Sequence, residues 1–489
     1  MSIDKETKVA LVSNRGPVSF VDTGSGFEMK QGAGGLAGAM DPVAESLGDR
    51  AVWIAAAITD ADRRAVAAGE AAKMKEVLGY PVELLDIEPQ TYSRYYDVVS
   101  NRMLWFANHC LWDELNIKEF GSDEVAAWEN AYLPVNRLFA DAVGTFADPS
   151  WLILFQDYHL AMAPRYLRRR DAGYTIFHFT HSSFCGPDDG LERLPAPIPG
   201  SVIDGMLGAD LIGFHVQAWA DNFLACCERI GAHVDRRRGV VSHDGRKSWV
   251  REYPIPIDAP DLRRRASGDA ARGWASSFEN ERKGALVVRA DRIEPSKNVV
   301  RGFEAFGLLL DRRSDLADTT FIACLYPSRQ SMPEYQRYGD LIEESVQKVN
   351  ARHPDSVQLF TQDDYDRTLG ALTVYDVLVV NPIMDGMNLV SKEGPTLNQK
   401  DGLLVLSRGA GSFEELGAHA IPIEDAFDVE ETAAALARAL DTPSDERRRL
   451  SEELRGAAGA RSPEDWIDAQ LEDLLRVKRG EEPGTPWGA

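Results

Sequence analysis

The fold is decided by the apolar run Val377-Leu378-Val379-Val380 and the stretch that follows it, Asp385-Gly386-Met387-Asn388-Leu389-Val390-Ser391-Lys392-Glu393. The apolar run predicts a fully buried strand of a parallel sheet, and the later residues predict a loop that opens onto a helix. Ligands of open α/β sheets bind beyond the carboxyl ends of the strands. Gly386 allows the backbone to approach a ligand, and the N–H groups of Met387 to Leu389 are placed to meet a phosphate. Because Asp385 and Glu393 suit sugar hydroxyls better than anions, the loop predicts a nucleotide-sugar site.

The rest of the chain alternates short apolar runs with helical segments. A chain of 489 residues is too long for a single hydrophobic core, so its length predicts two sizeable domains. The expected strands are residues 9–12, 52–54, 151–155, 176–179 and 211–214, and then 285–288, 321–325, 357–360, 377–380 and 403–406. The alternation predicts an α/β protein of two Rossmann-like, doubly wound domains facing a central cleft. We expect an N-terminal domain over residues 1–256, a second over 257–460, a closing helix over 461–478 and a disordered tail over 479–489, with the proline-rich stretch 251–260 as the linker.

Composition excludes several classes of partner. The formal net charge is −23, from 77 acidic and 54 basic residues, which argues against nucleic acid or an anionic membrane. No apolar run approaches membrane-spanning length, and the first residues lack an apolar segment of signal-peptide type. The five cysteines have neither CxxC nor metal-ligand spacing. We therefore expect reduced, mostly buried thiols in a cytoplasmic protein.

Basic residues at a second strand end point to a diphosphate. Arg292 and Lys297 follow a predicted buried strand and precede a predicted helix. Arginine supplies a planar fork and lysine a compact charge, and both suit the charge that develops on a leaving diphosphate. The ordinary interpretation is a solvated strand-to-helix loop. The Asp385 loop at another strand end of the same predicted sheet favours the functional interpretation.

Further polar residues follow other predicted strands. Arg15 follows the first strand in SNRGP, with Gly34 and Gly35 shortly after it. Arg329 follows the strand that ends at Leu325, and Asp157 and His181 follow two strands of the N-terminal half. A single histidine is more often structural, and two glycines more often form an ordinary turn. Polar groups at so many strand ends favour a site.

These motifs together resemble a known family. The ordered set SNRGP, GGL, YYDVVSNRMLW, FQDYHL, FTH, DRIEPSKN, PSR and NPIMDGMNLVSKE is similar to the trehalose-6-phosphate synthase family, glycosyltransferase family 20. The resemblance runs from Val9 to about Leu475, and DGMNLVSKE is its most specific part. It implies a GT-B fold and a retaining transfer of glucose from a nucleoside diphosphate sugar to a sugar phosphate. It implies no metal or other cofactor.

The resemblance also implies roles for residues. Arg15 and Arg329 match clamps on the acceptor phosphate, and Tyr96 and Trp105 match positions of the acceptor pocket. Gly34 and Gly35 match a mobile loop that closes on the donor. The remaining matches are Asp157 and His181 around the reacting sugars, Arg292 and Lys297 on the donor diphosphate, Asp385 with Gly386, Met387, Asn388, Leu389 and Val390 on the donor sugar and phosphates, and Glu393 on the ribose.

The residues favour one mechanism. Double displacement requires a carboxylate nucleophile, and Asp385 is the only candidate, although its surroundings suit a grip on sugar hydroxyls. We therefore expect front-face transfer, with Asp157, His181, Arg292, Lys297 and Asp385 as the catalytic set. The acidic cluster 363–366 resembles a metal-binding DxD motif, but a solvated helix start explains it better.

Three departures from the family pattern leave alternatives open. The usual HIPFP segment is His181-Ser182-Ser183-Phe184-Cys185 here, the usual WSG tryptophan is absent after Trp53, and LDYSKG is replaced by residues 293–298. The donor remains open between UDP- and GDP-glucose. The alternatives are a pseudo-glycosyltransferase or a synthase acting on a cyclitol or polyol phosphate, a non-catalytic sugar-phosphate sensor, and a transferase like glycogen synthase. A homo-oligomer is possible.

Overall fold

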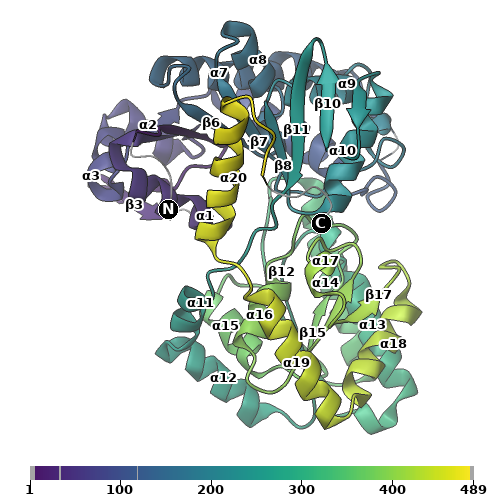
Figure 1. The fold of residues 1–489 in the computed structure, drawn as a ribbon. Coiled ribbons are helices and arrows are strands. Elements are labelled where there is room, and N and C mark those ends of the chain that lie inside the picture. Colours follow the sequence, from purple (N-terminus) through teal and green to yellow (C-terminus); the bar gives the residue numbers. More distant parts are fainter. Residues whose placement is uncertain (1–5, 32–34, 118, 485–489) are drawn as a thin grey trace. The chain divides into compact units, whose positions relative to one another are not determined.

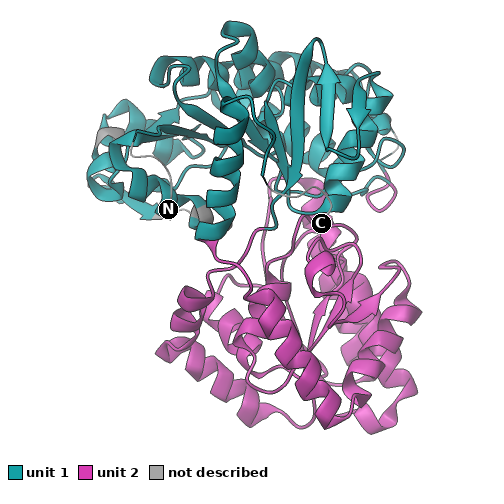
Figure 2. Ribbon diagram, in the orientation of Figure 1, with its two compact units in different colours: residues 1–112, 117–254, 464–489 teal, residues 113–116, 255–463 magenta. Residues whose placement is uncertain are grey.

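The computed structural model describes residues 6–31, 35–117 and 119–484 (Figure 1). The chain divides into two compact units (Figure 2). Unit 1 comprises residues 1–112, 117–254 and 464–489, and unit 2 comprises residues 113–116 and 255–463. Each unit is built around one sheet of largely parallel strands, and each is described by itself below.

Unit 1 contains a nine-stranded sheet in the order β5-β4-β1-β6-β7-β8-β11-β10-β9. Its strands are β1 (Val9–Val12), β4 (Ala51–Ala56), β5 (Val82–Leu85), β6 (Leu152–Gln156), β7 (Thr175–Phe179), β8 (Leu211–Phe214), β9 (His233–Asp235), β10 (Val240–His243) and β11 (Arg246–Glu252). In this sheet β10 runs opposite to both of its neighbours, β9 and β11, and β2 (Val18–Asp22) pairs with β3 (Phe27–Gln31) in a separate hairpin. The helices are α1 (Gly35–Leu47), α2 (Asp60–Ala67), α3 (Met74–Leu78), α4 (Pro89–Ser93), α5 (Phe106–Asn108), α6 (Ser122–Ala127), α7 (Leu133–Phe146), α8 (Ala163–Arg170), α9 (Ile198–Met206), α10 (Gln217–Arg229) and α20 (Pro463–Lys478).

Unit 2 contains a six-stranded, wholly parallel sheet in the order β14-β13-β12-β15-β16-β17. Its strands are β12 (Leu286–Arg292), β13 (Thr320–Tyr326), β14 (Val357–Phe360), β15 (Val377–Val380), β16 (Leu403–Ser407) and β17 (Ile421–Ile423). The helices are α11 (Ala259–Ala266), α12 (Asp269–Glu281), α13 (Val299–Arg312), α14 (Pro333–Arg352), α15 (Tyr365–Val374), α16 (Val390–Leu397), α17 (Phe413–Leu416), α18 (Val429–Asp441) and α19 (Ser444–Ala458).

Successive strand residues of unit 2 feed two separate cores, which explains the unbroken apolar runs. In β15, Leu378 and Val380 pack with α11, α12, α15 and α19 on one face. Val377 and Val379 pack with α13, α14 and α18 on the other face. Because side chains alternate along a strand, a strand buried on both faces must be apolar throughout. The prediction of a doubly wound parallel sheet is confirmed.

The units differ from the expected domain boundaries mainly at the C-terminal end. The helix α20 was expected as a separate closing element over 461–478, but it packs into unit 1. Trp466 is buried, its indole N–H donates to Tyr253 O at 2.9 Å, and the Tyr253 hydroxyl donates to Asp473 at 2.8 Å. The change of unit after β11 falls between residues 254 and 255, inside the proline-rich stretch.

The beginning of the expected tail also makes contacts. Glu482 pairs with Arg238 at 2.9 Å, so residues 479–484 extend the packing of α20 where disorder was expected. The five cysteines are free, and all but Cys110 are buried, as expected for reduced thiols. Within the described ranges, every helix is too short or too polar to cross a membrane.

Candidate active site

The strand order of unit 2 places its candidate residues at one point. Order reverses between β12 and β15, and ligands of such sheets bind in the crevice beyond the carboxyl ends at this switch point. Arg292 ends β12, Lys297 lies in the turn that follows, and Asp385 lies in the loop after β15. Lys297 Nζ donates to Asp385 Oδ2 at 2.5 Å, which joins the two loops across the switch point.

Lys297 is held as a cation at this point. Burial by itself disfavours the charged amine, but Asp385 and Asp291 outweigh burial and raise the pKa of Lys297. Asp385 also accepts a hydrogen bond from Asn388 Nδ2 at 2.9 Å. Asn388 has a φ of 69°, a left-handed conformation that asparagine tolerates. The Asp385 carboxylate is therefore oriented by two donors.

The loop after β15 ends in unpaired backbone donors. The backbone N–H groups of Met387, Asn388 and Leu389 form no hydrogen bond within the part of the chain that the structure describes. They lie directly before Val390, the first residue of α16. Consecutive free N–H groups at a helix start bind anions, because the helix dipole adds to their partial charges. This geometry suits a phosphate.

A second loop supports the first. Asp385 N donates to Gly409 O at 2.9 Å, Gly411 N donates to Asp385 O at 3.1 Å, and Ser412 N donates to Met387 O at 2.9 Å. A Cβ on Gly409 would collide with Ile383 O, and one on Gly411 would collide with Gly386 O. These glycines therefore allow the loop after β16 to lie against the Asp385 loop.

Two arginines of unit 2 share one buried carboxylate. Glu294 is fully buried and accepts from Arg292 NH2 at 3.3 Å, Arg329 NH1 at 2.6 Å and Ser328 Oγ at 3.0 Å. Burial would raise the pKa of Glu294, but Arg292 and Arg329 hold it at about 2. Arg329 also donates to the Tyr335 hydroxyl at 3.0 Å. Sequence reasoning gave Glu294 no role, yet it fixes both cations.

Glu393 lies in the first turn of α16 without a charged partner among the described residues. Burial raises its pKa to about 7. A carboxyl group in this state binds hydroxyl groups through either protonation form, which is compatible with its expected role on a ribose. Glu393 forms no ion pair with Arg292 or Lys297, whereas Asp385 pairs with Lys297.

Unit 1 repeats the same topology, with its own switch point between β1 and β6. Arg15 follows β1 and is exposed. The loop that carries Arg15 is anchored to β4. The Trp53 indole donates to Ser13 Oγ at 2.8 Å, and Ser13 Oγ donates to Arg15 O at 2.7 Å. A Cβ on Gly16 would lie 3.1 Å from Ala55 Cβ, so the loop approaches β4 closely.

Asp157 and His181 follow β6 and β7 and are linked. Asp157 has a φ of 71°, and its Oδ1 accepts from the backbone N–H of Tyr158 at 3.1 Å and of His181 at 3.2 Å. His181 Nε2 lies 2.9 Å from Gln156 Oε1. Burial and the nearby histidines lower the pKa of His181 well below its usual value, so the ring is neutral. With Nε2 donating to Gln156, Nδ1 is left as an acceptor.

Tyr96 and Trp105 lie on a π-helix, Arg94–Trp105, which sequence periodicity does not predict. Tyr96 stacks on His159 with ring centroids 5.6 Å apart, and on Tyr92 at the same distance. Trp105 is buried and stacks on His109 at 3.8 Å. Tyr96 is therefore the more accessible of the two, and π-helical turns are frequent at functional sites.

Two predictions concern residues that carry less structural information. Gly34 lies outside the described residues, and Gly35 is the first residue of α1. The interpretation of the acidic cluster 363–366 as a helix start is confirmed, because Asp364 caps α15 by accepting from Arg367 N at 2.9 Å.

Asp204, His243 and Asp244 have metal-ligand spacing, but Asp204 is already paired with Arg165 at 2.6 Å.

The model of one protein family, described as glycosyltransferase family 20, matches residues 7–476. The chain belongs to glycosyltransferase family 20. Among family relatives, a trehalose-6-phosphate synthase from Mycobacterium sp. (strain KMS) is 30% identical, with 98% of this chain and 97% of the relative covered. A validamine 7-phosphate valienyltransferase from Streptomyces hygroscopicus subsp. jinggangensis (strain 5008) is also 30% identical, with 86% and 85% covered.

Solved structures of the family share the fold. An alpha,alpha-trehalose-phosphate synthase (UDP-forming) from Burkholderia vietnamiensis matches with a TM-score of 0.81 at 26% identity, covering 97% of this chain and 98% of that chain. The prediction of a GT-B protein with two parallel-sheet domains is confirmed. The chain is a glycosyltransferase enzyme of family 20.

One departure from the family 20 pattern directly follows His181 in the chain. Ser182 and Ser183, which replace apolar residues of the usual segment, are buried in unit 1. Ser183 Oγ donates to Asn108 O at 2.6 Å, and Asn108 Nδ2 donates to Ser182 Oγ at 3.4 Å. These hydroxyls are thus satisfied within unit 1, directly after His181 in the chain.

Sequence reasoning missed the residues that position the site. Glu294, the glycines of the loop 408–412 and Trp53 act through other side chains or the backbone. The glycine pair Gly409 and Gly411, directly after a buried strand, is a signal that was available in the sequence. Nothing in the residue pattern of Glu294 distinguishes a buried carboxylate from a solvated one.

Proposed function

We propose that this protein is a retaining glucosyltransferase that moves glucose from a nucleoside diphosphate glucose to glucose 6-phosphate, giving α,α-trehalose 6-phosphate. The observation that carries the proposal is the cluster at the switch point of unit 2. There Lys297 is paired with Asp385, and Arg292 and Arg329 are held by Glu294, beside three free backbone donors. This combination of cations, N–H donors and an oriented carboxylate suits a diphosphate joined to a sugar.

The proposed donor contacts divide by chemistry. Arg292, Lys297 and the N–H groups of Met387 to Leu389 bind the diphosphate, while Asp385 accepts from sugar hydroxyls. Glu393, with its pKa near 7, accepts from the ribose hydroxyls. Arg329 shares Glu294 with Arg292, so a role on the donor diphosphate is as compatible with its position as the expected role on the acceptor phosphate.

The proposed mechanism is front-face transfer. The acceptor hydroxyl oxygen bonds to the anomeric carbon while the bond from that carbon to the diphosphate oxygen breaks. The hydroxyl proton passes to the departing phosphate oxygen, and the diphosphate leaves with the electron pair. Lys297 and Arg292 stabilise the charge that develops on it. Asp385 is already engaged by Lys297 and Asn388, which favours a binding role over that of a covalent nucleophile.

The proposed acceptor contacts lie in unit 1. Arg15 is exposed and its loop is anchored through Ser13 and Trp53, so it presents a fixed cation to a phosphate. Asp157 and neutral His181 are the polar groups expected beside the reacting hydroxyl. Tyr96, which stacks on Tyr92 and His159, completes the proposed acceptor contacts.

A second candidate is the transfer of a cyclitol unit or transfer to a cyclitol or polyol phosphate. It is supported by the relative named validamine 7-phosphate valienyltransferase, which is as similar in identity as the trehalose-6-phosphate synthase. The altered segment behind His181 supports it as well. Both candidates use the same phosphate contacts, so the acceptor distinguishes them.

The test is a matrix of nucleoside diphosphate release. The full chain is mixed with UDP-, GDP- or ADP-glucose, each with and without glucose 6-phosphate, and products are identified by mass spectrometry. Release that requires glucose 6-phosphate, with a trehalose 6-phosphate product, supports the proposal and names the donor. Release that requires a cyclitol phosphate instead favours the second candidate. Donor and acceptor binding without release would indicate a sensor, and turnover on oligosaccharides would indicate a polymerising transferase.

A further inference from the structure

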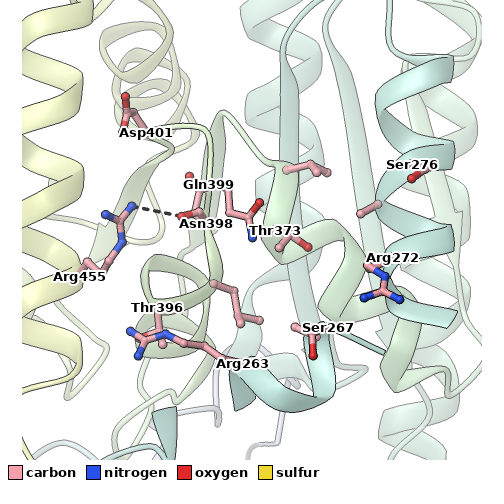
Figure 3. Close-up of a pocket in the computed structure, with 14 residues that line it drawn as sticks. Arg263, Ser267, Arg272, Ser276, Thr373, Thr396, Asn398, Gln399, Asp401 and Arg455 are labelled. Atoms are coloured by element: carbon pink, nitrogen blue, oxygen red, sulfur yellow. Dashed lines mark hydrogen bonds between the residues drawn. The ribbon is translucent and has the colours of Figure 1, made fainter. Parts of the chain in front are cut away.

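A cavity of about 720 Å³ lies in unit 2 (Figure 3), and its lining residues are not those of the candidate site. We call it the amino-edge pocket. It lies between α11, α12, the end of α15, the end of α16 and α19. Thr373 and Val374 precede β15, and Asn398 to Asp401 precede β16, so the pocket is at the amino ends of these strands. The Asp385 loop follows the carboxyl end of β15, at the opposite edge of the same sheet.

The pocket is basic in a strongly acidic chain. Arg263, Arg272 and Arg455 line it, and Asp401 is its one acidic lining residue. Figure 3 shows Arg455 reaching Asn398, and its guanidinium donates to Asn398 O at 3.1 Å. The formal net charge of the whole chain is −23. A local excess of arginine against that background favours an anionic ligand.

Arg263 differs from its two neighbours on α11 in its charge pairing. It is the first of three consecutive arginines on α11. Arg264 and Arg265, which do not line the pocket, both pair with Asp261. Arg263 forms no ion pair with any residue in the described ranges. A guanidinium that lines a cavity without a carboxylate is available to a ligand anion.

A buried hydroxyl of the wall is unpaired as well. Thr396 lines the pocket, its side chain is 5% exposed, and Thr396 Oγ1 has no hydrogen-bond partner among the described residues. By contrast, Thr373 Oγ1 donates to Leu369 O at 2.9 Å. A buried hydroxyl without a partner destabilises a fold, so its presence here points to a ligand that supplies the partner.

We propose that the amino-edge pocket binds a small phosphorylated, polyhydroxylated metabolite of the sugar-phosphate class. Arg263 and Arg455 bind the phosphate, and Thr396 with Ser267, Ser276 and Gln399 binds hydroxyl groups. The volume is in the range of small-molecule sites, which is roughly 300–1,000 Å³. The residues are distinct from those of the candidate active site, so this is a second binding site.

The pocket has a direct route to the proposed donor site. Helix α16 begins at Val390, carries Glu393 in its first turn, and ends at Leu397 beside the pocket. A ligand that orders the end of α16 therefore changes the free energy of the donor contacts at its start. Linkage makes such coupling reciprocal. This coupling rests on the proposed function, whereas binding in the pocket does not.

The binding test uses glucose 6-phosphate and isothermal titration of the full chain. An Arg15→Ala background removes the proposed acceptor clamp in unit 1, so that remaining binding is assigned elsewhere. In that background we expect Arg263→Ala to weaken binding at least about tenfold, since it removes a charge-assisted contact. The matched control is Arg264→Ala, which removes a neighbouring exposed arginine outside the pocket and leaves affinity unchanged. Equal affinities for the two variants would overturn the proposal.

Thr396→Val provides a test that does not depend on charge. Valine preserves the shape and removes an unpaired hydroxyl, so the melting temperature of the free protein stays the same or rises. Binding of glucose 6-phosphate weakens by several-fold. A lower melting temperature of the free protein, with unchanged affinity, would mean that the hydroxyl is used within the fold and would overturn the proposal.

The coupling is measured as the Kd for UDP with and without saturating glucose 6-phosphate in the Arg15→Ala background. We expect a shift of about fivefold or more, which the additional change Arg263→Ala abolishes. An unchanged Kd would overturn the coupling. If UDP does not bind at all, the proposed function fails, while the titrations above still decide whether the pocket is a site.

Discussion

The replacement Glu294→Gln tests how unit 2 keeps two arginines together. Glu294 is fully buried, and Arg292 and Arg329 hold its pKa at about 2, against 4.5 for a free glutamate. A difference of this size corresponds to roughly 3 kcal/mol of unfolding free energy at pH 7, at about 1.4 kcal/mol for each pKa unit. Glutamine keeps the shape but removes the charge, so the variant loses about that amount.

The depressed pKa of Glu294 also sets how the loss of unfolding free energy depends on pH. A depressed folded-state pKa stabilises the protein above the unfolded pKa, and this stabilisation is lost as the pH falls from about 4.5 towards 2. The deficit of Glu294→Gln should therefore be full at pH 7 and fall to less than half of that at pH 3. Urea unfolding is monitored through hydrogen exchange of peptides from β12 and β15. This readout reports the free energy of unfolding of unit 2 alone.

The control variant also lies in unit 2, and two outcomes would refute the reasoning. Glu430→Gln removes an exposed partner of Arg312, and we expect no measurable change from it. A Glu294→Gln deficit below about 1 kcal/mol at pH 7 would refute the reasoning, since losing one partner of a buried pair usually costs about 3–5 kcal/mol. A deficit that is equally large at pH 7 and pH 3 would assign it to packing instead of charge.

Three other outcomes follow from the site. Lys297→Ala should lower turnover by about 10²–10³-fold with an unchanged melting temperature of unit 1, and near-normal kcat would remove its role on the leaving group. Arg15→Ala should raise the KM for the sugar phosphate about 10–100-fold and leave the donor KM unchanged, as steady-state kinetics in both substrates would reveal. Glu393 has a raised pKa of about 7, so folded-state stability falls as the pH rises from about 4.5 through 7. Glu393→Gln should therefore raise the melting temperature more at pH 8 than at pH 5, while weakening donor binding; equal shifts at both pH values would contradict the buried-charge explanation.

The sequence predicted the sheets well because their strands are buried on both faces. Runs such as Val377 to Val380 have no polar residue to allow another interpretation, and their carboxyl ends located Arg292, Lys297 and Asp385. The catalytic and binding roles of these residues stay predictions. Their proximity across the switch point follows from strand order, which short apolar runs do not encode by themselves.

The features that sequence reasoning missed depend on contacts between distant segments. In the sequence, Glu294 cannot be distinguished from the other charged residues of a polar loop. Only the fold places Arg329 beside it. The π-helix Arg94–Trp105 has no periodic signature distinct from an α-helix over so short a length. The apolar stripe of α20 predicts that the helix packs, but not onto which unit, because only the fold brings Trp466 to Tyr253.

The return of α20 to unit 1 affects the order of events during synthesis. Unit 2 is almost continuous in sequence, whereas unit 1 lacks Trp466 and Asp473 until about two hundred further residues have been translated. At 5–20 residues per second, the nascent first unit waits roughly 10–40 s with Phe179 and Tyr253 uncovered. Unit 2 is thus free to complete its core on the ribosome before unit 1 does. A chain that stopped before Pro463 would contain nearly all of unit 2 but would lack the helix that covers Phe179 and Tyr253 in unit 1.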